Sequence, residues 1–168
     1  MKKVSRNMLL VSIFLVIFFF VGVPNVTAQE YEGLQGVFSV KAIFDMRIGN
    51  AKSAALHLDL IHQTFKDKNI TELTSEPLFV VVFIGPSVKL VSKNREGFSA
   101  EDNQSLDKIA STISQMSKDG IKLEICMTAA NLFGVEPASI LPEIKKVPNG
   151  FISLLAYEAK GFGLVPVY

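Results

Sequence analysis

The sequence predicts an α/β fold in which a mostly parallel sheet is sandwiched between helices as a three-layer α/β/α domain. Strand-like and helix-like segments alternate along the chain, no hairpin signal joins two strands, and the run Leu78–Ile84 (LFVVVFI) is apolar throughout. Strands separated by helices form parallel sheets, and an unbroken apolar run suits a strand covered on both faces. Because the chain has 168 residues, 49% of them hydrophobic, we expect one core.

Residues 1–28 show the three-part pattern of a signal peptide: a cationic start, an apolar run and a small-residue cleavage site. These parts are Lys2, Lys3 and Arg6; Met8 to Val23; and Val26-Thr27-Ala28. The apolar run falls short of the roughly 20 residues that span a bilayer. We therefore expect cleavage after Ala28 and a periplasmic or secreted protein that keeps no membrane segment.

Residues 29–36 are expected to form a flexible lead, and residues 37–168 a single domain. The chain has 17 Lys and Arg and 16 Asp and Glu, and three basic but no acidic residues lie in the leader. The mature part would have 14 basic and 16 acidic residues, a net charge of −2. Without a basic run, it has no electrostatic footprint for nucleic acid.

The first half of the domain predicts a strand at Val37–Met46 and a helix from Gly49 to about Lys66. The helix carries apolar residues on one face and Leu56 and Leu60 on the opposite face. A helix that is apolar on two sides is deeply buried or part of a subunit contact. The helix therefore suggests a homo-oligomer. The face toward the core comprises Ala51, Ala54, Ala55, Leu58, Ile61 and Phe65.

Gly85-Pro86 ends the apolar strand, and a short helix is expected at residues 87–93. Ser99 can cap a longer helix, with Asp102 in the reciprocal capping position. That helix is expected to close at Asp119-Gly120.

The second half of the domain begins with the strictly alternating strand Ile121–Cys126 (IKLEIC), in which Cys126 shares a face with Lys122 and Glu124. A helical turn or two is expected after it, ending at Gly134. A proline-containing loop then leads to a helix at about residues 149–160. The last strand, residues 162–168, contains Pro166 and is expected at a sheet edge.

Cys126 is the leading candidate for chemistry because it closes a strand and precedes a helix. A helix N-terminus favours the thiolate, which is the nucleophilic form. As the single cysteine, it cannot form a disulfide within the chain. The alternative is that Cys126 serves as a small buried hydrophobe.

Further candidates lie near the carboxyl ends of strands, where ligands gather in parallel sheets. They are Asp45, Ser87, Met127 and Thr128. The two histidines, at positions 57 and 62, lack the spacing of a metal pair. No metal site, cofactor-binding motif or esterase motif is predicted.

Several segments together resemble the DsrE/DsrF-like family. The C-terminal half of that family is similar to Cys126–Val135 (CMTAANLFGV), Ile140–Pro142, Val147–Gly150 and Glu158–Phe162, and its central strand and Gly-Pro turn are similar to Phe79–Lys89. Its first strand and helix resemble Ile43–Phe65.

The resemblance implies a three-layer α/β/α domain with a parallel sheet of about five strands, assembled as trimers or hexamers. Helix amides that stabilise an anionic sulfur would make a metal or organic cofactor unnecessary, so we expect none. Several members of the family carry sulfur as a cysteine persulfide, and the cysteine of their motif matches Cys126. Two departures follow it, since Met127 and Thr128 stand where the family often has glycine and a small polar residue.

Our first hypothesis is a sulfur carrier or thiol-handling protein that uses Cys126 and exchanges sulfur with a donor or acceptor protein. Whether such transfer would be enzymatic, as in a sulfurtransferase, stays open. One alternative is a non-catalytic module that binds a small anion at the same strand ends. The other is an interaction module whose oligomer is the functional unit.

Overall fold

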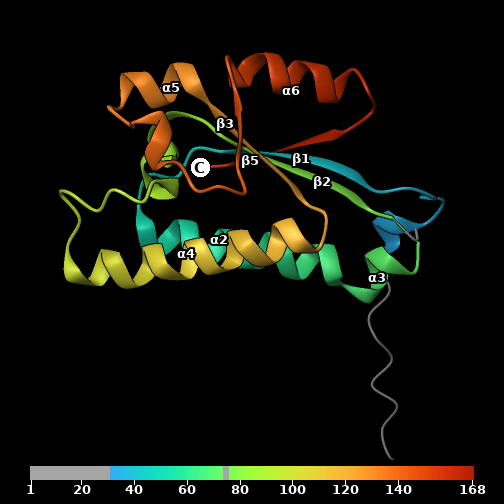
Figure 1. The fold of residues 1–168 in the computed structure, drawn as a ribbon. Helices are drawn as coiled ribbons and strands as arrows, with labels where there is room; N and C mark the ends of the chain where they lie inside the picture. The colour runs from blue at the N-terminus through green and yellow to red at the C-terminus, as the bar shows by residue number, and fades with distance from the viewer. Residues whose placement is uncertain (1–30, 74–75) are drawn as a thin grey trace, which may run out of the picture. The chain divides into compact units, whose positions relative to one another are not determined.

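Five parallel strands form one sheet, as Figure 1 shows in a computed structural model that describes residues 31–73 and 76–168. The strand order is β4-β3-β2-β1-β5, and every neighbouring pair is parallel. The expected leader, residues 1–28, lies outside the described residues. The strands are β1 (Lys41–Met46), β2 (Leu78–Phe83), β3 (Lys122–Cys126), β4 (Lys145–Val147) and β5 (Gly163–Val167).

Helices cover both faces of this sheet, so the expected α/β sandwich is confirmed. In Figure 1, α2 (Ala51–Lys66) and α4 (Ala100–Lys118) run below the sheet, while α5 (Met127–Leu132) and α6 (Gly150–Glu158) lie above it. None of the helices in the described part of the chain is long and apolar enough to cross a membrane. The short elements are η2 (Glu32–Leu34), α3 (Lys68–Thr71), η3 (Gly85–Val91) and η4 (Pro137–Ser139).

Local sequence signals explain where the longer helices begin and end. Ser99 accepts from the Asp102 N–H at 3.0 Å while Asp102 accepts from the Ser99 N–H at 3.2 Å, which is the expected capping box. Asn50 caps α2 through the Ser53 N–H. Gly120, which follows α4, has a φ of 92°, a conformation that favours glycine.

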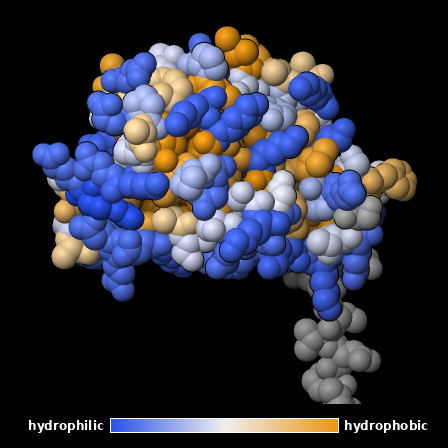
Figure 2. Space-filling model, in the orientation of Figure 1, coloured by the Kyte–Doolittle hydropathy of each residue, from blue (hydrophilic) through white to orange (hydrophobic). Residues whose placement is uncertain are grey.

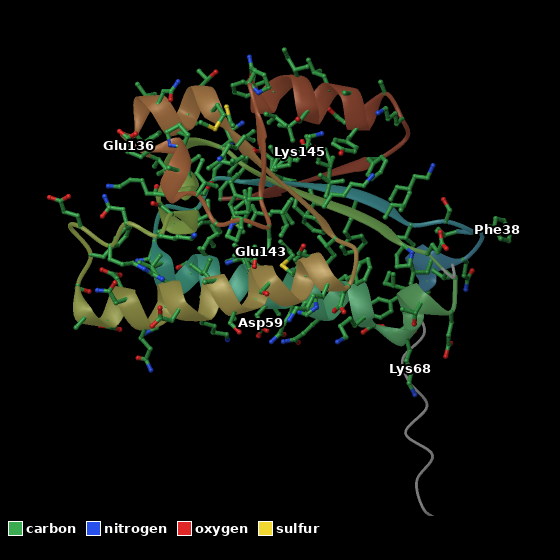
Figure 3. All side chains as sticks on the ribbon, viewed as in Figure 1. Phe38, Asp59, Lys68, Glu136, Glu143 and Lys145 are labelled. Atoms are coloured by element: carbon green, nitrogen blue, oxygen red, sulfur yellow. The ribbon has the colours of Figure 1, made fainter. Side chains whose placement is uncertain are left out.

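One strand predicted from sequence was too long, and one strand was not predicted. β1 begins at Lys41 rather than Val37, because β2 begins at Leu78 opposite Lys41 and the preceding residues have no strand beside them. Phe38 is exposed and projects away from the rest of the domain (Figure 3). The proline-containing loop contains the additional strand β4, whose three residues pair with the end of β3.

Large apolar side chains lie exposed on two helices. Leu56 and Leu60 are exposed on α2, on the side predicted from sequence. A second group, Phe151, Ile152 and Leu155, is exposed on α6, and Figure 2 shows hydrophobic residues over that helix. Within α6 only Gly150 and Leu154 are buried, while Tyr157 is partly buried and packs against the core.

Candidate functional site

Cys126 lies at the carboxyl end of β3 and is the N-cap residue of α5. Its Sγ accepts a hydrogen bond from the Ala129 N–H at 3.4 Å, a role that serine or aspartate more often fills. The residue is only 3% exposed. The helix start predicted from sequence is therefore present, but the sulfur is covered.

Gly150 provides the cover, because α6 begins directly over Cys126. A Cβ at position 150 would lie 2.9 Å from the Cβ of Cys126 and 2.9 Å from Cδ1 of Ile84. Such contacts are too short for any side chain, so glycine alone lets the helix approach this closely. Asn149 caps α6 by accepting the Phe151 N–H at 2.9 Å. Two helices, α5 and α6, thus begin beside Cys126.

Thr128 ties the start of α5 to the segment before α6. Its N–H and its hydroxyl both donate to the Pro148 carbonyl oxygen, at 3.2 and 2.9 Å. The neighbouring Met127 is partly buried and packs against the core. Both residues stand where sequence placed them, beside Cys126, and their binding role stays a prediction.

Asp45 and Ser87 occupy the neighbouring strand ends. Asp45 is buried at the end of β1, and both of its carboxylate oxygens accept from Nε of Arg47, at 3.0 and 2.9 Å. The Ser87 hydroxyl is buried and lies 2.7 Å from the Met46 carbonyl oxygen and 3.0 Å from that of Ile84. Ser87 thus joins the ends of β1 and β2, and any ligand role for either residue stays a prediction.

The register places Arg47 and Cys126 at the same height of the sheet. Met46 pairs with Phe83, and Phe83 pairs with Ile125. One residue further on, Arg47, Ile84 and Cys126 therefore form a row at the carboxyl ends of β1, β2 and β3. Cys126 and Arg47 both face the α6 side, since Gly150 contacts the former and Phe151 of the same helix stacks on the guanidinium of the latter, 5.1 Å from Cζ to the ring centroid.

Glu124 forms a buried polar cluster that sequence analysis missed. It lies two residues before Cys126 on the same face, and it accepts from the Ser153 hydroxyl at 2.7 Å and the Tyr157 hydroxyl at 3.3 Å. Lys145 of β4 (Figure 3) places Nζ 4.0 Å from the same carboxylate. The alternation of β3 signalled the shared face, but only the packed α6 shows that Glu124 is covered.

Burial raises the pKa of Tyr157, and the negative charge of Glu124 and their hydrogen bond raise that pKa further. A raised pKa means that the folded state holds this proton more tightly than the unfolded state. The stability from this interaction is therefore complete below about pH 10 and is lost as the pH rises further.

Ultraviolet titration should detect this proton. The other two tyrosines, Tyr31 and Tyr168, are exposed, so Tyr157 should ionise last. Tyr157→Phe should remove the latest component of the titration and leave the earlier ones unchanged. Identical titration curves for the two proteins, apart from amplitude, would contradict this assignment.

The two histidines lie on α2, across the sheet from Cys126. The Nδ1 of His57 is 2.8 Å from the Ser53 carbonyl oxygen. His62 Nε2 lies 2.6 Å from Oδ2 of Asp119, and this hydrogen bond holds the pKa of Asp119 below its usual value. Neither histidine is placed to act on the cysteine. Among residues 31–73 and 76–168, no cluster of three potential metal ligands occurs.

A cavity of about 200 Å³ lies near the end of α5, where Phe133, Gly134 and Ser139 contribute to its lining. Neither Cys126 nor Met127 lines it. This cavity therefore does not reach the buried cysteine.

These features define an all-parallel α/β protein with a capping cysteine at the end of its third strand. The sequence model of the DsrE/DsrF-like family matches residues 41–166. The chain belongs to the DsrE/DsrF-like family.

Similar proteins were found both by sequence and by structure. An uncharacterized protein of Aquifex aeolicus is 25% identical over 128 residues, which cover 76% of this chain and 56% of that protein. The chain thus spans a little over half of that relative's length. Protein MTH1491 of Methanobacterium thermoautotrophicum, whose function is unknown, matches with a TM-score of 0.59 at 12% identity, over 76% of this chain and 99% of its own. The ychN protein of E. coli gives a TM-score of 0.49 at 11% identity, over 77% and 99%.

Proposed function

We propose that this protein carries sulfane sulfur as a persulfide on Cys126. The single observation that carries the proposal is the place of Cys126, where α5 begins and where Gly150, the first residue of α6, packs against the cysteine Cβ. Helix N-termini favour negative charge, so this place suits the anionic outer sulfur of a persulfide. Membership of the DsrE/DsrF-like family is consistent with this chemistry.

In the loading step, the Cys126 thiolate attacks a sulfane sulfur of a polysulfide. An S–S bond forms to Sγ, the S–S bond of the donor breaks, and the shortened polysulfide leaves with the electron pair. In the unloading step, an acceptor thiolate attacks the outer sulfur and Cys126 leaves as the thiolate. Because one S–S bond replaces another in each step, neither step needs an oxidant, a metal or an organic cofactor.

The burial of Cys126 means that the carrier also needs an opening step. We place this step at residues 148–150 and the first turn of α6, because Gly150 packs against Cβ of the buried Cys126. Thr128 holds this segment through its two hydrogen bonds to Pro148. Phe151 and Ile152 in the first turn of α6 are exposed, and a helix end of this kind can open locally without unfolding the domain.

The proposal includes export and self-association. The leader at residues 1–28 would direct the carrier to the periplasm or outside the cell. The exposed apolar residues of α2 and α6 would be covered in a homo-oligomer. A donor or acceptor protein would then meet the assembled carrier.

Loading with inorganic polysulfide tests the proposal. Reduced protein should gain one sulfur atom on the peptide that contains Cys126 and should lose it on treatment with dithiothreitol. Cys126→Ser should gain none, and it should stay folded by circular dichroism, because serine keeps an acceptor for the Ala129 N–H.

One combination of results would refute the carrier. In it, the wild type gains no sulfur, and iodoacetamide modifies Cys126 only in denaturant. Cys126 would then be a structural core residue.

A further inference from the structure

Arg47 presents an unused hydrogen-bonding surface at the end of β1. Its Nε donates to both carboxylate oxygens of Asp45. A guanidinium has five N–H donors, and the four on the terminal nitrogens have no hydrogen-bond partner among the described residues. The Arg47 side chain is 31% exposed, so an incoming group can reach it.

The guanidinium is held in place from two sides. Asp45, whose side chain is 5% exposed, anchors Nε from below, and the Phe151 ring packs against the cation. Arg95 makes a useful contrast, since its side chain is also 31% exposed but its Nη2 pairs with Asp107, which is 79% exposed. The Arg47 guanidinium is therefore held through Nε by a buried carboxylate, while its two terminal nitrogens are free to donate. An arginine in this arrangement can bind an oxyanion through two parallel hydrogen bonds.

Arg47 and Cys126 lie at the same edge of the sheet. Arg47 and Cys126 flank Ile84 in one row, so their Cα atoms are about 10 Å apart, twice the spacing of neighbouring strands. The first turn of α6 extends over both, with Gly150 at the cysteine and Phe151 at the arginine. A small molecule bound to Arg47 would lie beside the segment that must open to free the sulfur.

We propose that Arg47 is a binding residue for the oxyanion group, carboxylate or sulfonate, of the small sulfur compound that exchanges with Cys126. The identity of the ligand as a sulfur compound rests on the proposed function. The anion site itself rests only on Arg47, Asp45 and Phe151. Asp45 acts here as a positioning residue, because it orients the guanidinium and does not touch the ligand.

Binding of propionate and of ethanesulfonate, followed by NMR at constant ionic strength, tests this site without any sulfur chemistry. Each anion should shift the Arg47 side-chain N–H and Gly150 amide signals to saturation, and uncharged propanol should not. Arg47→Gln should weaken binding about tenfold or more, which is roughly 1.4 kcal/mol. Arg95→Gln is the matched control and should bind as the wild type does. The anion that binds more tightly identifies the ligand class.

Equal affinity in wild type and Arg47→Gln, or shifts that never saturate, would overturn the proposal. Arg47→Lys keeps the positive charge but lacks the two terminal guanidinium nitrogens, so it should bind the anions with intermediate affinity. If these anions bind through Arg47 but Cys126 never accepts sulfur, the carrier is rejected and the anion site stands. If Cys126 accepts sulfur but Arg47→Gln changes no affinity, the anion site is rejected alone.

Discussion

Gly150→Ala is expected to destabilise the domain by about 1–3 kcal/mol, the usual cost of overpacking a filled core. The new methyl group would lie 2.9 Å from the Cβ of Cys126, the last residue of β3, which pairs with Val147 of β4. The first turn of α6 should therefore lift. Urea unfolding should show the loss of stability, and native alkylation of Cys126 should become faster.

Gly163→Ala is the matched control, because a Cβ there would meet only the Lys41 carbonyl oxygen, at 3.8 Å. Its stability and its alkylation rate should stay close to those of the wild type. An alanine at position 150 that changes neither quantity would show that α6 does not cover the cysteine as described.

Glu124→Ala is expected to cost about 2 kcal/mol. The substitution removes a buried acceptor and leaves the hydroxyls of Ser153 and Tyr157 without their partner, and hydrogen bonds to charged groups contribute about 1.5–3 kcal/mol. Since both hydroxyls belong to α6, the loss should again appear as faster alkylation of Cys126. Denaturant unfolding and alkylation kinetics measure the two effects.

Glu124→Gln separates the effect of the carboxylate charge from that of the hydrogen bonds to Ser153 and Tyr157. It keeps the side-chain size and one acceptor, so its stability should fall less than that of Glu124→Ala. It also removes the negative charge that raises the pKa of Tyr157, so the tyrosine should ionise at lower pH. An unchanged titration of Tyr157 in this variant would contradict the cluster.

Local signals were sufficient to predict most of the fold. The capping pair Ser99 and Asp102 marks the start of α4 directly, and the apolar run of β2 identifies a central strand. β4 was missed because it has only three residues, two of which are exposed lysines. Its pairing with β3 depends on a partner distant in sequence, which periodicity does not report.

The site was predictable only in part. The position of Cys126 at a strand end and helix start follows from local sequence, and the structure shows both features. Its burial depends on Gly150, which is 24 residues away in sequence. The same holds for Glu124, because its partners lie on α6. Arg47 is not among the site residues predicted from sequence, since the free terminal nitrogens of its guanidinium depend on the orientation set by Asp45.

The mass of the intact protein, isolated from its native compartment with and without reductant, tests the central claim most directly. We predict a mass one sulfur atom above that of a chain starting at Gln29, and loss of that sulfur on reduction. The same spectrum would report the cleavage after Ala28. A single unmodified mass in both samples, with Cys126 unreactive until the protein unfolds, would contradict the carrier.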